Sequence, residues 1–224
     1  MVVLHHLENS RSQRILWLLE ELGVAYELKT YLRDPETSLA PPELLAVHPM
    51  GKAPVITHDG HTIAESGAII EYLLDQFDSE DTLLPAKSSA AYQQYRYWMH
   101  FAEGSFMPLM VMSLIFNRLE NARMPFFAKP IAKSIAGKVR QSYLQPNTKR
   151  ALDFMESTLA ASEWFAGSDF SAADIQMSFP VEAAATRAGL GDRYPALQAF
   201  LDRVHARPAY RQALERGGAL TLMS

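Results

Sequence analysis

The sequence contains no cysteine. This absence excludes a disulfide scaffold, a thiolate zinc site, an iron–sulfur cluster and any mechanism that uses a protein thiol. If the function uses a reactive sulfur, that sulfur has to come from a ligand. His5, His6, His58 and His61 have no acidic ligand at a fixed spacing beside them, so we expect no metal site.

The sequence also lacks a long apolar run and a strong excess of one charge sign. No apolar stretch approaches the roughly 18 residues that a membrane span needs. The segment MVVLHHLENS has no basic region followed by an apolar stretch, as a secretory signal would. The net charge is −4, so a uniformly basic face for nucleic acid is not indicated. We expect a cytoplasmic protein that binds no nucleic acid and has no membrane span.

Charge is unevenly distributed along the chain. Residues 1–80 hold 5 Lys and Arg against 13 Asp and Glu, a net charge of −8, whereas the remaining residues hold 16 and 12, a net charge of +4. The change of sign near residue 80 suggests a domain boundary. A chain of 224 residues has room for one or two domains.

The first 32 residues have the pattern of a strand, a helix and a second strand. The predicted strands are 2–6 and 25–32, and apolar residues at helical spacing lie between them in NSRSQRILWLLEELG. Ser10 and Gln13 have the spacing of a capping box at the start of this helix. Short connections predict a right-handed βαβ unit with parallel strands.

The next segment predicts a hairpin and another helix. After a short helical region at 40–51, strands are expected at 53–57 and 61–64, and the Asp59-Gly60 pair between them is a strong hairpin signal. A helix follows from Ser66. The order β-α-β-α-β-β-α is that of a thioredoxin-like domain.

The second part of the chain reads as helical throughout. We expect a thioredoxin-like domain at 1–79, a linker at 80–87 and an all-helical domain at 88–224, a fold of the α/β plus all-α class. Pro108 lies inside the first long apolar pattern and should kink or split that helix. The expected helices are 88–119, 125–144, 147–161, 171–188, 195–206 and 208–216.

The pair Glu65-Ser66 stands at a junction between a strand and a helix. Ser66 is a suitable N-cap, and this role alone would explain it. Alternatively, the free amides of the helix start and the Ser66 hydroxyl would hold a carboxylate, and Glu65 would take an ammonium. Those two groups on one carbon are an amino-acid head group.

Ser10 opens the first helix, where it is either an N-cap or a hydroxyl donor to a ligand anion, with Ser12 as its rival. The Ala53-Pro54 pair opens the third strand. A trans bond is the commoner form, because only about 5–6% of X-Pro bonds are cis. A cis bond would turn the Ala53 backbone outward to pair with an extended peptide-like ligand.

The whole chain resembles a cytosolic glutathione transferase. The resemblance rests on NSRSQRILWLLEELG, HPMGKAPVI, ESGAIIEYL and WFAGSDFSAADIQMSFP, and it spans nearly 1 to 220. The order and spacing of these segments are most similar to the fungal and bacterial branch typified by the yeast glutathione transferases.

This resemblance implies a glutathione site and a homodimer. It implies a cis bond at Ala53-Pro54, pairing of the Ala53 backbone with the cysteinyl part of glutathione, and binding of the γ-glutamyl group by Glu65 and Ser66. Lys52 has a position that often contacts the glycyl carboxylate. The helix from Ser66 and the long helix after residue 88 are expected at the dimer interface.

The catalytic position differs from that of several classes in the family. There is no Tyr before Tyr26 and no Cys, and serine classes place the hydroxyl at about Asn9 or Ser10. Some serine-type relatives carry basic residues near Leu39-Ala40, where this chain is apolar. We expect Ser10 to be catalytic, with no tightly bound cofactor and with glutathione as co-substrate.

The expected activity is detoxification by attack of the glutathione thiolate on a small apolar electrophile. The helical domain, with the adaptable apolar segment 92–116, would hold that electrophile. The alternatives are a non-catalytic binding or assembly module of the same fold and a glutathione-dependent peroxidase or isomerase.

Overall fold

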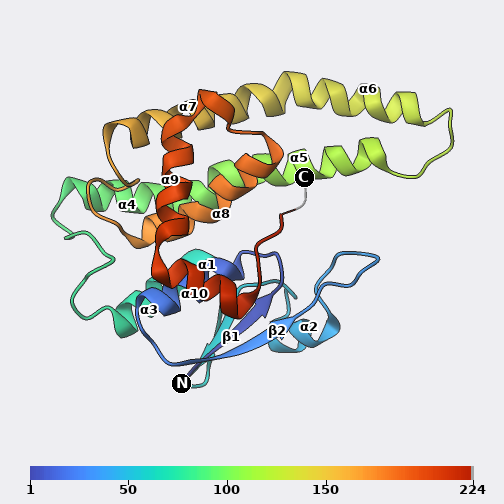
Figure 1. Cartoon of the computed structure of the whole chain (residues 1–224). Helices are drawn as coiled ribbons and strands as arrows, with labels where there is room; N and C mark the ends of the chain where they lie inside the picture. The colour runs from blue at the N-terminus through green and yellow to red at the C-terminus, as the bar shows by residue number, and fades with distance from the viewer. Residues whose placement is uncertain (223–224) are drawn as a thin grey trace.

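A computed structural model describes residues 1–222 of the chain, with a small sheet at the N-terminal end and helices after it (Figure 1). The strands are β1 (Val2–Leu7), β2 (Tyr26–Tyr31), β3 (Val55–His58) and β4 (His61–Ala64). The helices are α1 (Ser12–Glu21), α2 (Pro42–Val47), α3 (Ser66–Phe77), α4 (Ala90–Phe101), α5 (Met107–Asn121), α6 (Lys129–Val139), α7 (Gln145–Ala161), α8 (Ala172–Arg187), α9 (Pro195–Ala206) and α10 (Pro208–Gly217), with the shorter turns η1 (Ala102–Phe106), η2 (Arg140–Leu144) and η3 (Gly191–Arg193).

The N-terminal part is a four-stranded sheet in the order β2-β1-β3-β4. β1 and β2 are parallel, and β3 is antiparallel to both β1 and β4, which confirms the predicted thioredoxin-like arrangement. Asp59 and Gly60 join β3 to β4 with φ values of 46° and 79°. Positive φ at both turn residues is what a two-residue hairpin turn requires, so the hairpin prediction is confirmed.

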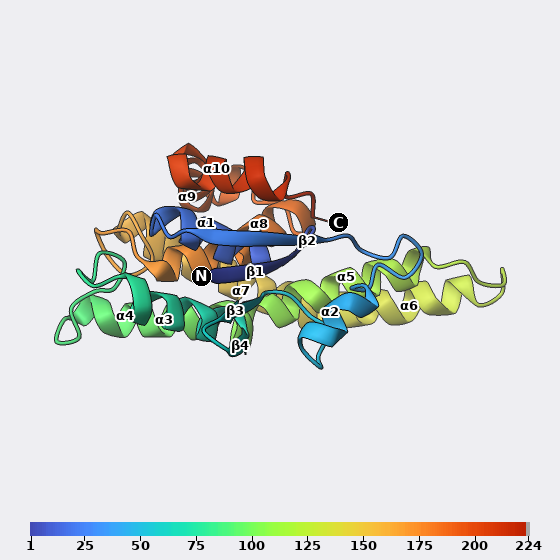
Figure 2. The same ribbon diagram turned by 90° about the horizontal axis from the view of Figure 1, so that it is seen from below.

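Helix α1 is buried on more faces than its apolar spacing suggests. Residues 12–19 are all buried, although only part of this segment is apolar. The reason is that α10 covers the outer side of α1 (Figures 1 and 2). Trp17 packs edge-on against Tyr210 at 5.1 Å between ring centroids, and Glu21 pairs with Arg207. The end of the chain therefore folds back onto the first helix.

The helical domain begins with one continuous helical stretch, Ala90–Asn121, interrupted by the π-helical turn η1. Pro108 lies in the first turn of α5, directly after η1, so the predicted disturbance near the proline is a π-helical turn within the helix and not a break in it. By length and composition this is the one stretch among residues 1–222 that would pass for a membrane span, a test that core helices also pass. Its buried residues, among them Trp98 and Phe106, belong to the core.

The segment between α3 and α4 is held by specific hydrogen bonds. The Asp78 carboxylate accepts from the Thr82 and Leu83 amides, and the Leu83 carbonyl accepts from the Ala172 amide of α8. α3 ends at Phe77 and α4 begins at Ala90. The exact domain division at 1–79, 80–87 and 88–224 stays a prediction.

The start of α8 is a capping box, as the Ser171-Ala172-Ala173-Asp174 pattern predicts. The fully buried Asp174 carboxylate accepts from the Ser171 amide and hydroxyl and from the Phe165 amide. These bonds satisfy amides that would otherwise be buried without partners, so the pattern is structural.

Candidate active site

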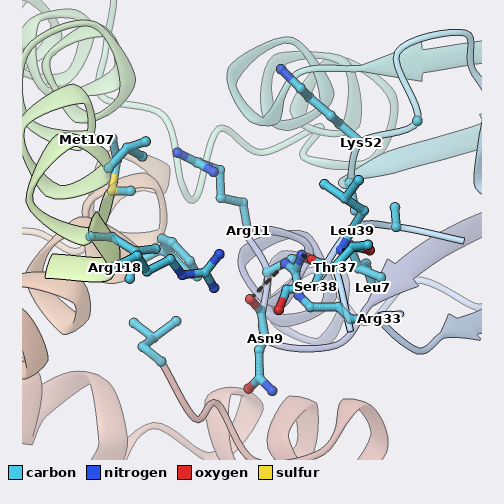
Figure 3. Close-up of a pocket in the computed structure, with 18 of the residues that line it drawn as sticks. Leu7, Asn9, Arg11, Arg33, Thr37, Ser38, Leu39, Lys52, Met107 and Arg118 are labelled. Atoms are coloured by element: carbon cyan, nitrogen blue, oxygen red, sulfur yellow. Dashed lines mark hydrogen bonds between the residues drawn. The ribbon is translucent and has the colours of Figure 1, made fainter. Parts of the chain in front are cut away.

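A cavity of about 340 Å³ lies between the N-terminal sheet and the helical domain. Its lining comes from the end of β1, from the segments 33–40 and 51–53, from α5 and α8, and from Leu222 near the chain end. Figure 3 shows Lys52 and Leu39 on one side and Met107 and Arg118 on the other, with Asn9 and Arg11 between them. A cavity of this size suits a small ligand.

Ser10 lines this cavity, directly after β1. Its side chain is nearly buried, and its Oγ accepts a hydrogen bond from the Ser12 amide at 3.2 Å. The predicted capping box with Gln13 is wrong. α1 starts at Ser12 without a side-chain cap, and the Gln13 side chain instead lies beside Gly217 of α10. Docking of α10 therefore takes away the local partner that the sequence suggested.

Ser12 is fully buried and does not line the cavity. Its Oγ accepts from the Leu7 amide at 3.2 Å and lies 2.9 Å from His6 Nδ1. His6 Nε2 lies 3.0 Å from the Gly217 carbonyl, which can only accept, so Nε2 carries the proton. Burial lowers the pKa of His6, so the ring is neutral and Nδ1 is an acceptor.

These assignments place the hydroxyl hydrogen of Ser10. The Ser12 hydroxyl donates either to His6 Nδ1 or to the Leu7 carbonyl at 3.2 Å, and in both cases the Ser10 hydroxyl donates to Ser12 Oγ across 2.8 Å. In the ligand-free protein the Ser10 hydrogen therefore points away from the cavity. A ligand anion next to Ser10 would have to compete for it with Ser12 Oγ.

Asn9 is held in a left-handed conformation, with φ of 49°. Its side-chain Oδ1 accepts from the Thr221 amide at 2.7 Å, and its carbonyl accepts from Arg33 at 3.2 Å. The Asn9 side chain is thus tied to the end of the chain. Of the three polar residues considered for catalysis, Asn9 and Ser10 line the cavity, and Ser10 is the one of these two that carries a hydroxyl.

Lys52 and Ala53 line the cavity on the side of the sheet, and the Ala53-Pro54 bond is cis. The commoner trans form, which the residues by themselves favour, is thus not adopted. The segment around Leu39-Ala40 lies in the same wall. Arg33 supports this segment by donating to the Ser38 carbonyl at 3.0 Å.

Glu65 and Ser66 are not among the residues that line the cavity. The β3–β4 register pairs Val55 with Ala64, which places Ala53 and Ser66 at the same end of the hairpin. Ser66 is the first residue of α3 and not its N-cap. Its hydroxyl accepts from Arg14 Nη2 at 2.8 Å. Glu65 is exposed, with φ of 71°.

A partly buried ion network that sequence reasoning missed connects these residues to the helical domain. Arg14, 1% exposed, donates to Glu103 at 2.6 Å and to the Gln176 carbonyl at 2.8 Å, and Arg11 Nε donates to both Glu103 oxygens. Burial by itself would raise the pKa of the Glu103 carboxyl, but the Arg14 and Arg11 guanidinium groups outweigh it and lower that pKa. The available signal was Arg14 directly before the apolar run Ile15–Leu19, and Glu103 as the one acidic residue between positions 90 and 119.

Cationic side chains dominate the polar lining of the cavity. Among the described lining residues five are cationic and none is acidic; the cations are Arg11, Arg33, Lys52, Arg118 and Arg187. Burial, followed by the charges of Arg11 and Arg118, lowers the pKa of Arg187. The lining therefore suits a ligand that carries negative charge.

A larger hollow of about 880 Å³ lies between α5, α7 and the loop after α8. None of the site residues expected from the sequence lines it. The smaller cavity is therefore the candidate active site. Within residues 1–222 no group of three or more His, Asp or Glu is placed to hold a metal ion.

Two family models match the chain. The glutathione S-transferase N-terminal domain matches residues 1–75, and the glutathione S-transferase C-terminal domain matches residues 117–208. Glutathione S-transferase 3 of Schizosaccharomyces pombe is 39% identical over 100% of this chain and 92% of its own length. Glutathione S-transferase 1 of Saccharomyces cerevisiae is 32% identical over 98% and 97%.

Solved structures agree with the sequence matches. A glutathione S-transferase from Actinobacillus pleuropneumoniae has a TM-score of 0.80 at 33% identity and covers 98% of this chain and 94% of its own. A sphingomonad glutathione S-transferase complexed with glutathione has a TM-score of 0.71 at 26% identity and covers 96% and 98%. Neither the non-catalytic nor the peroxidase alternative is favoured by these matches. With its thioredoxin-like domain, its helical domain and the cavity between them, the chain belongs to the glutathione S-transferase family.

Proposed function

We propose that the protein conjugates glutathione to an electrophile and that Ser10 activates the glutathione thiol. One observation carries the choice of residue: Ser10 is the hydroxyl-bearing candidate that lines the cavity, whereas Ser12 is fully buried and bonded to His6 and Leu7. Only the thiolate is strongly nucleophilic, and a free thiol has a pKa near 8.5. A hydroxyl that donates to the sulfur lowers this pKa by stabilising the anion.

Glutathione would extend along the edge of the sheet. The amides of residues 66–68 have no acceptor within α3 and, with the Ser66 hydroxyl, suit the γ-glutamyl carboxylate, while Glu65 suits its ammonium. The Ala53 backbone would pair with the cysteinyl part and Lys52 with the glycyl carboxylate. This arrangement brings the sulfur to Ser10.

Activation then requires one hydrogen to change direction. The Ser10 hydroxyl turns its hydrogen from Ser12 Oγ to the sulfur, while Ser10 Oγ keeps the hydrogen bond from the Ser12 amide. The amides at the start of α1 add favourable potential for the anion. The thiolate attacks an electrophile held against α5 and α8.

The chemistry requires no tightly bound cofactor. A cytoplasmic role in detoxification belongs to the same proposal and rests on the family alone.

We expect Ser66→Ala and Glu65→Ala each to weaken glutathione binding about ten- to a hundredfold. Each change leaves a charged group of the ligand without its partner, which costs about 1.5–3 kcal/mol. Titration calorimetry measures the affinity, and thermal melting checks that Ser66→Ala still folds. Glu71→Ala, an exposed change on the same helix, serves as control. Unchanged affinity in both test variants would show that the γ-glutamyl group binds elsewhere.

We also propose a homodimer that uses α3, α4 and the adjoining face of α7. An aromatic groove of about 490 Å³ lies on this side, lined by Tyr97, Phe101, Tyr143 and Phe154 among others. Tyr97, Tyr143 and Phe154 are 46%, 50% and 43% exposed. A cluster of large exposed aromatic side chains is typical of an interaction surface, and identical chains associate most often as two-fold dimers.

Light scattering should therefore report about twice the chain mass of 25.1 kDa at micromolar concentration. The double change Tyr97→Glu with Phe154→Glu should give the monomer mass, because it places charge within the proposed interface. Phe127→Glu, at an exposed aromatic residue outside the groove, should leave the dimer intact. A monomeric wild type would contradict the dimer, and a dimer that survives the double change would contradict this interface.

A further inference from the structure

Three arginines line the cavity on the side of the electrophile. Arg11 comes from the start of α1, Arg118 from α5 and Arg187 from the end of α8. Figure 3 shows Arg118 reaching from the helical side toward Asn9 and Arg11, while Lys52 lies on the opposite side. Three separate segments thus contribute arginine residues to the cavity lining.

In the proposed binding mode, glutathione does not occupy the part of the cavity next to α5 and α8. Its two carboxylates lie at the start of α3 and beside Lys52, and its sulfur lies at Ser10. The arginine side of the cavity begins beyond Ser10, where α5 and α8 contribute Met107, Val111 and Phe179 to the lining. A molecule that receives the sulfur would occupy this space.

The positive charges of the arginines that line the cavity act on one another. The charges of Arg11 and Arg118 both lower the pKa of Arg187, and they lower that of Arg33 as well, after the larger effect of burial. All three arginines also interact with other groups of the chain, for example Arg11 with Glu103 and Arg187 with the Met110 carbonyl. A bound anion would offset the repulsion that remains between them.

We propose that the preferred electrophile is an apolar molecule that carries a carboxylate, and that Arg118 and Arg187, with Arg11, bind this carboxylate. Arginine suits the planar carboxylate because its guanidinium group can donate two parallel hydrogen bonds. The apolar body would lie on Met107, Val111 and Phe179. The inference rests on the proposed function, and it replaces the purely apolar electrophile expected from the sequence.

The test compares 4-chloro-3,5-dinitrobenzoate with its uncharged amide. With either compound the glutathione sulfur bonds to the carbon that carries chlorine, chloride leaves with the bonding electron pair, and the thiol proton goes to water. We expect kcat/KM, divided by the uncatalysed rate, to be about tenfold or more higher for the carboxylate. Arg118→Met and Arg187→Met should each reduce the carboxylate-to-amide ratio of these normalised values about tenfold. Arg118→Lys should retain part of this ratio because it retains the charge.

Arg123→Met removes the same charge from an exposed position outside the cavity and should leave the ratio unchanged. Calorimetry with the two glutathione conjugates, prepared chemically, compares their affinities without turnover. Equal affinities, or a ratio that neither arginine change reduces in variants that melt normally, would overturn the inference. Turnover of the amide alone would support glutathione conjugation while overturning the carboxylate preference. Absence of turnover with both compounds, together with tighter binding of the carboxylate conjugate, would instead count against the proposed function.

Discussion

Replacement of Ser10 by Ala should raise the pH midpoint of the conjugation rate by about one to two units. The hydroxyl is the group that would donate to the sulfur, and one hydrogen bond to a charged group contributes about 1.5–3 kcal/mol. If the thiol of the variant titrates near the free value of about 8.5, a shift of this size lowers the rate at pH 7 about eight- to twenty-fivefold. Glutathione affinity should change little, because the hydroxyl acts on the sulfur alone. A pH–rate series with one electrophile, together with calorimetry, measures both quantities.

Ser12→Ala is the matched control, since the two hydroxyls lie 2.8 Å apart. This change removes partners of His6 and the Leu7 amide in a buried site, so it should reduce the free energy of unfolding by about 1–3 kcal/mol. It also frees the Ser10 hydrogen, so it should not raise the pH midpoint. A raised midpoint in Ser12→Ala but not in Ser10→Ala would transfer the role to Ser12. If the pH midpoint is raised in neither variant, activation of the thiol by a serine hydroxyl is contradicted.

Arg14→Met should destabilise the protein by about 3–5 kcal/mol and weaken glutathione binding at the same time. The change removes the buried partner of Glu103 and the donors to Ser66 and to the Gln176 carbonyl. Loss of one member of a buried ion pair leaves the other charge poorly compensated. The position of the Ser66 hydroxyl, proposed to bind the γ-glutamyl group, also loses its support. Urea unfolding measures the stability, and calorimetry measures the affinity.

The dependence of the unfolding free energy on pH in the acidic range distinguishes the effect of this ion network from that of apolar packing. The lowered pKa of Glu103 contributes stability that is fully present above the ordinary pKa of a carboxyl and is lost as the pH falls from that value through the lowered pKa. In Arg14→Met the loss should be smaller, because Glu103 keeps only Arg11. Arg123→Met, an exposed change, should stay within about 0.5 kcal/mol of the wild type. A loss below 1 kcal/mol in Arg14→Met would show that the network contributes little.

Features that depend on local sequence could be predicted. The hairpin at Asp59-Gly60 and the capping box at Ser171 each depend on residues within a few positions of one another, so their patterns are visible in the sequence. The π-helical turn next to Pro108 likewise lies where the missing amide of one residue disturbs the helix. The β-α-β order then determines the topology, because parallel neighbours need a crossover connection.

The parts of the site that depend on distant segments could not be predicted. Arg14 and Glu103 are 89 residues apart, and nothing in either segment indicates the other. The capping box expected at Ser10 is absent, and the Gln13 side chain lies beside Gly217 of α10 instead. Ser66 is not the N-cap, because α3 begins at Ser66 itself and Glu65 has the N-cap position. The convergence of Arg118 and Arg187 with Arg11 becomes visible only once α5 and α8 are placed against the sheet.

Because α10 returns to α1, the thioredoxin-like domain of this chain is not an autonomous unit. A fragment that ends after α3 would expose Leu16 and Trp17 to water and leave Glu21 without Arg207. It would also lose the Gly217 carbonyl that sets the His6 tautomer, and with it the orientation of the hydrogens on Ser12 and Ser10. The last helix thus determines, through His6, the direction of the hydroxyl hydrogen of Ser10 near the start of the chain.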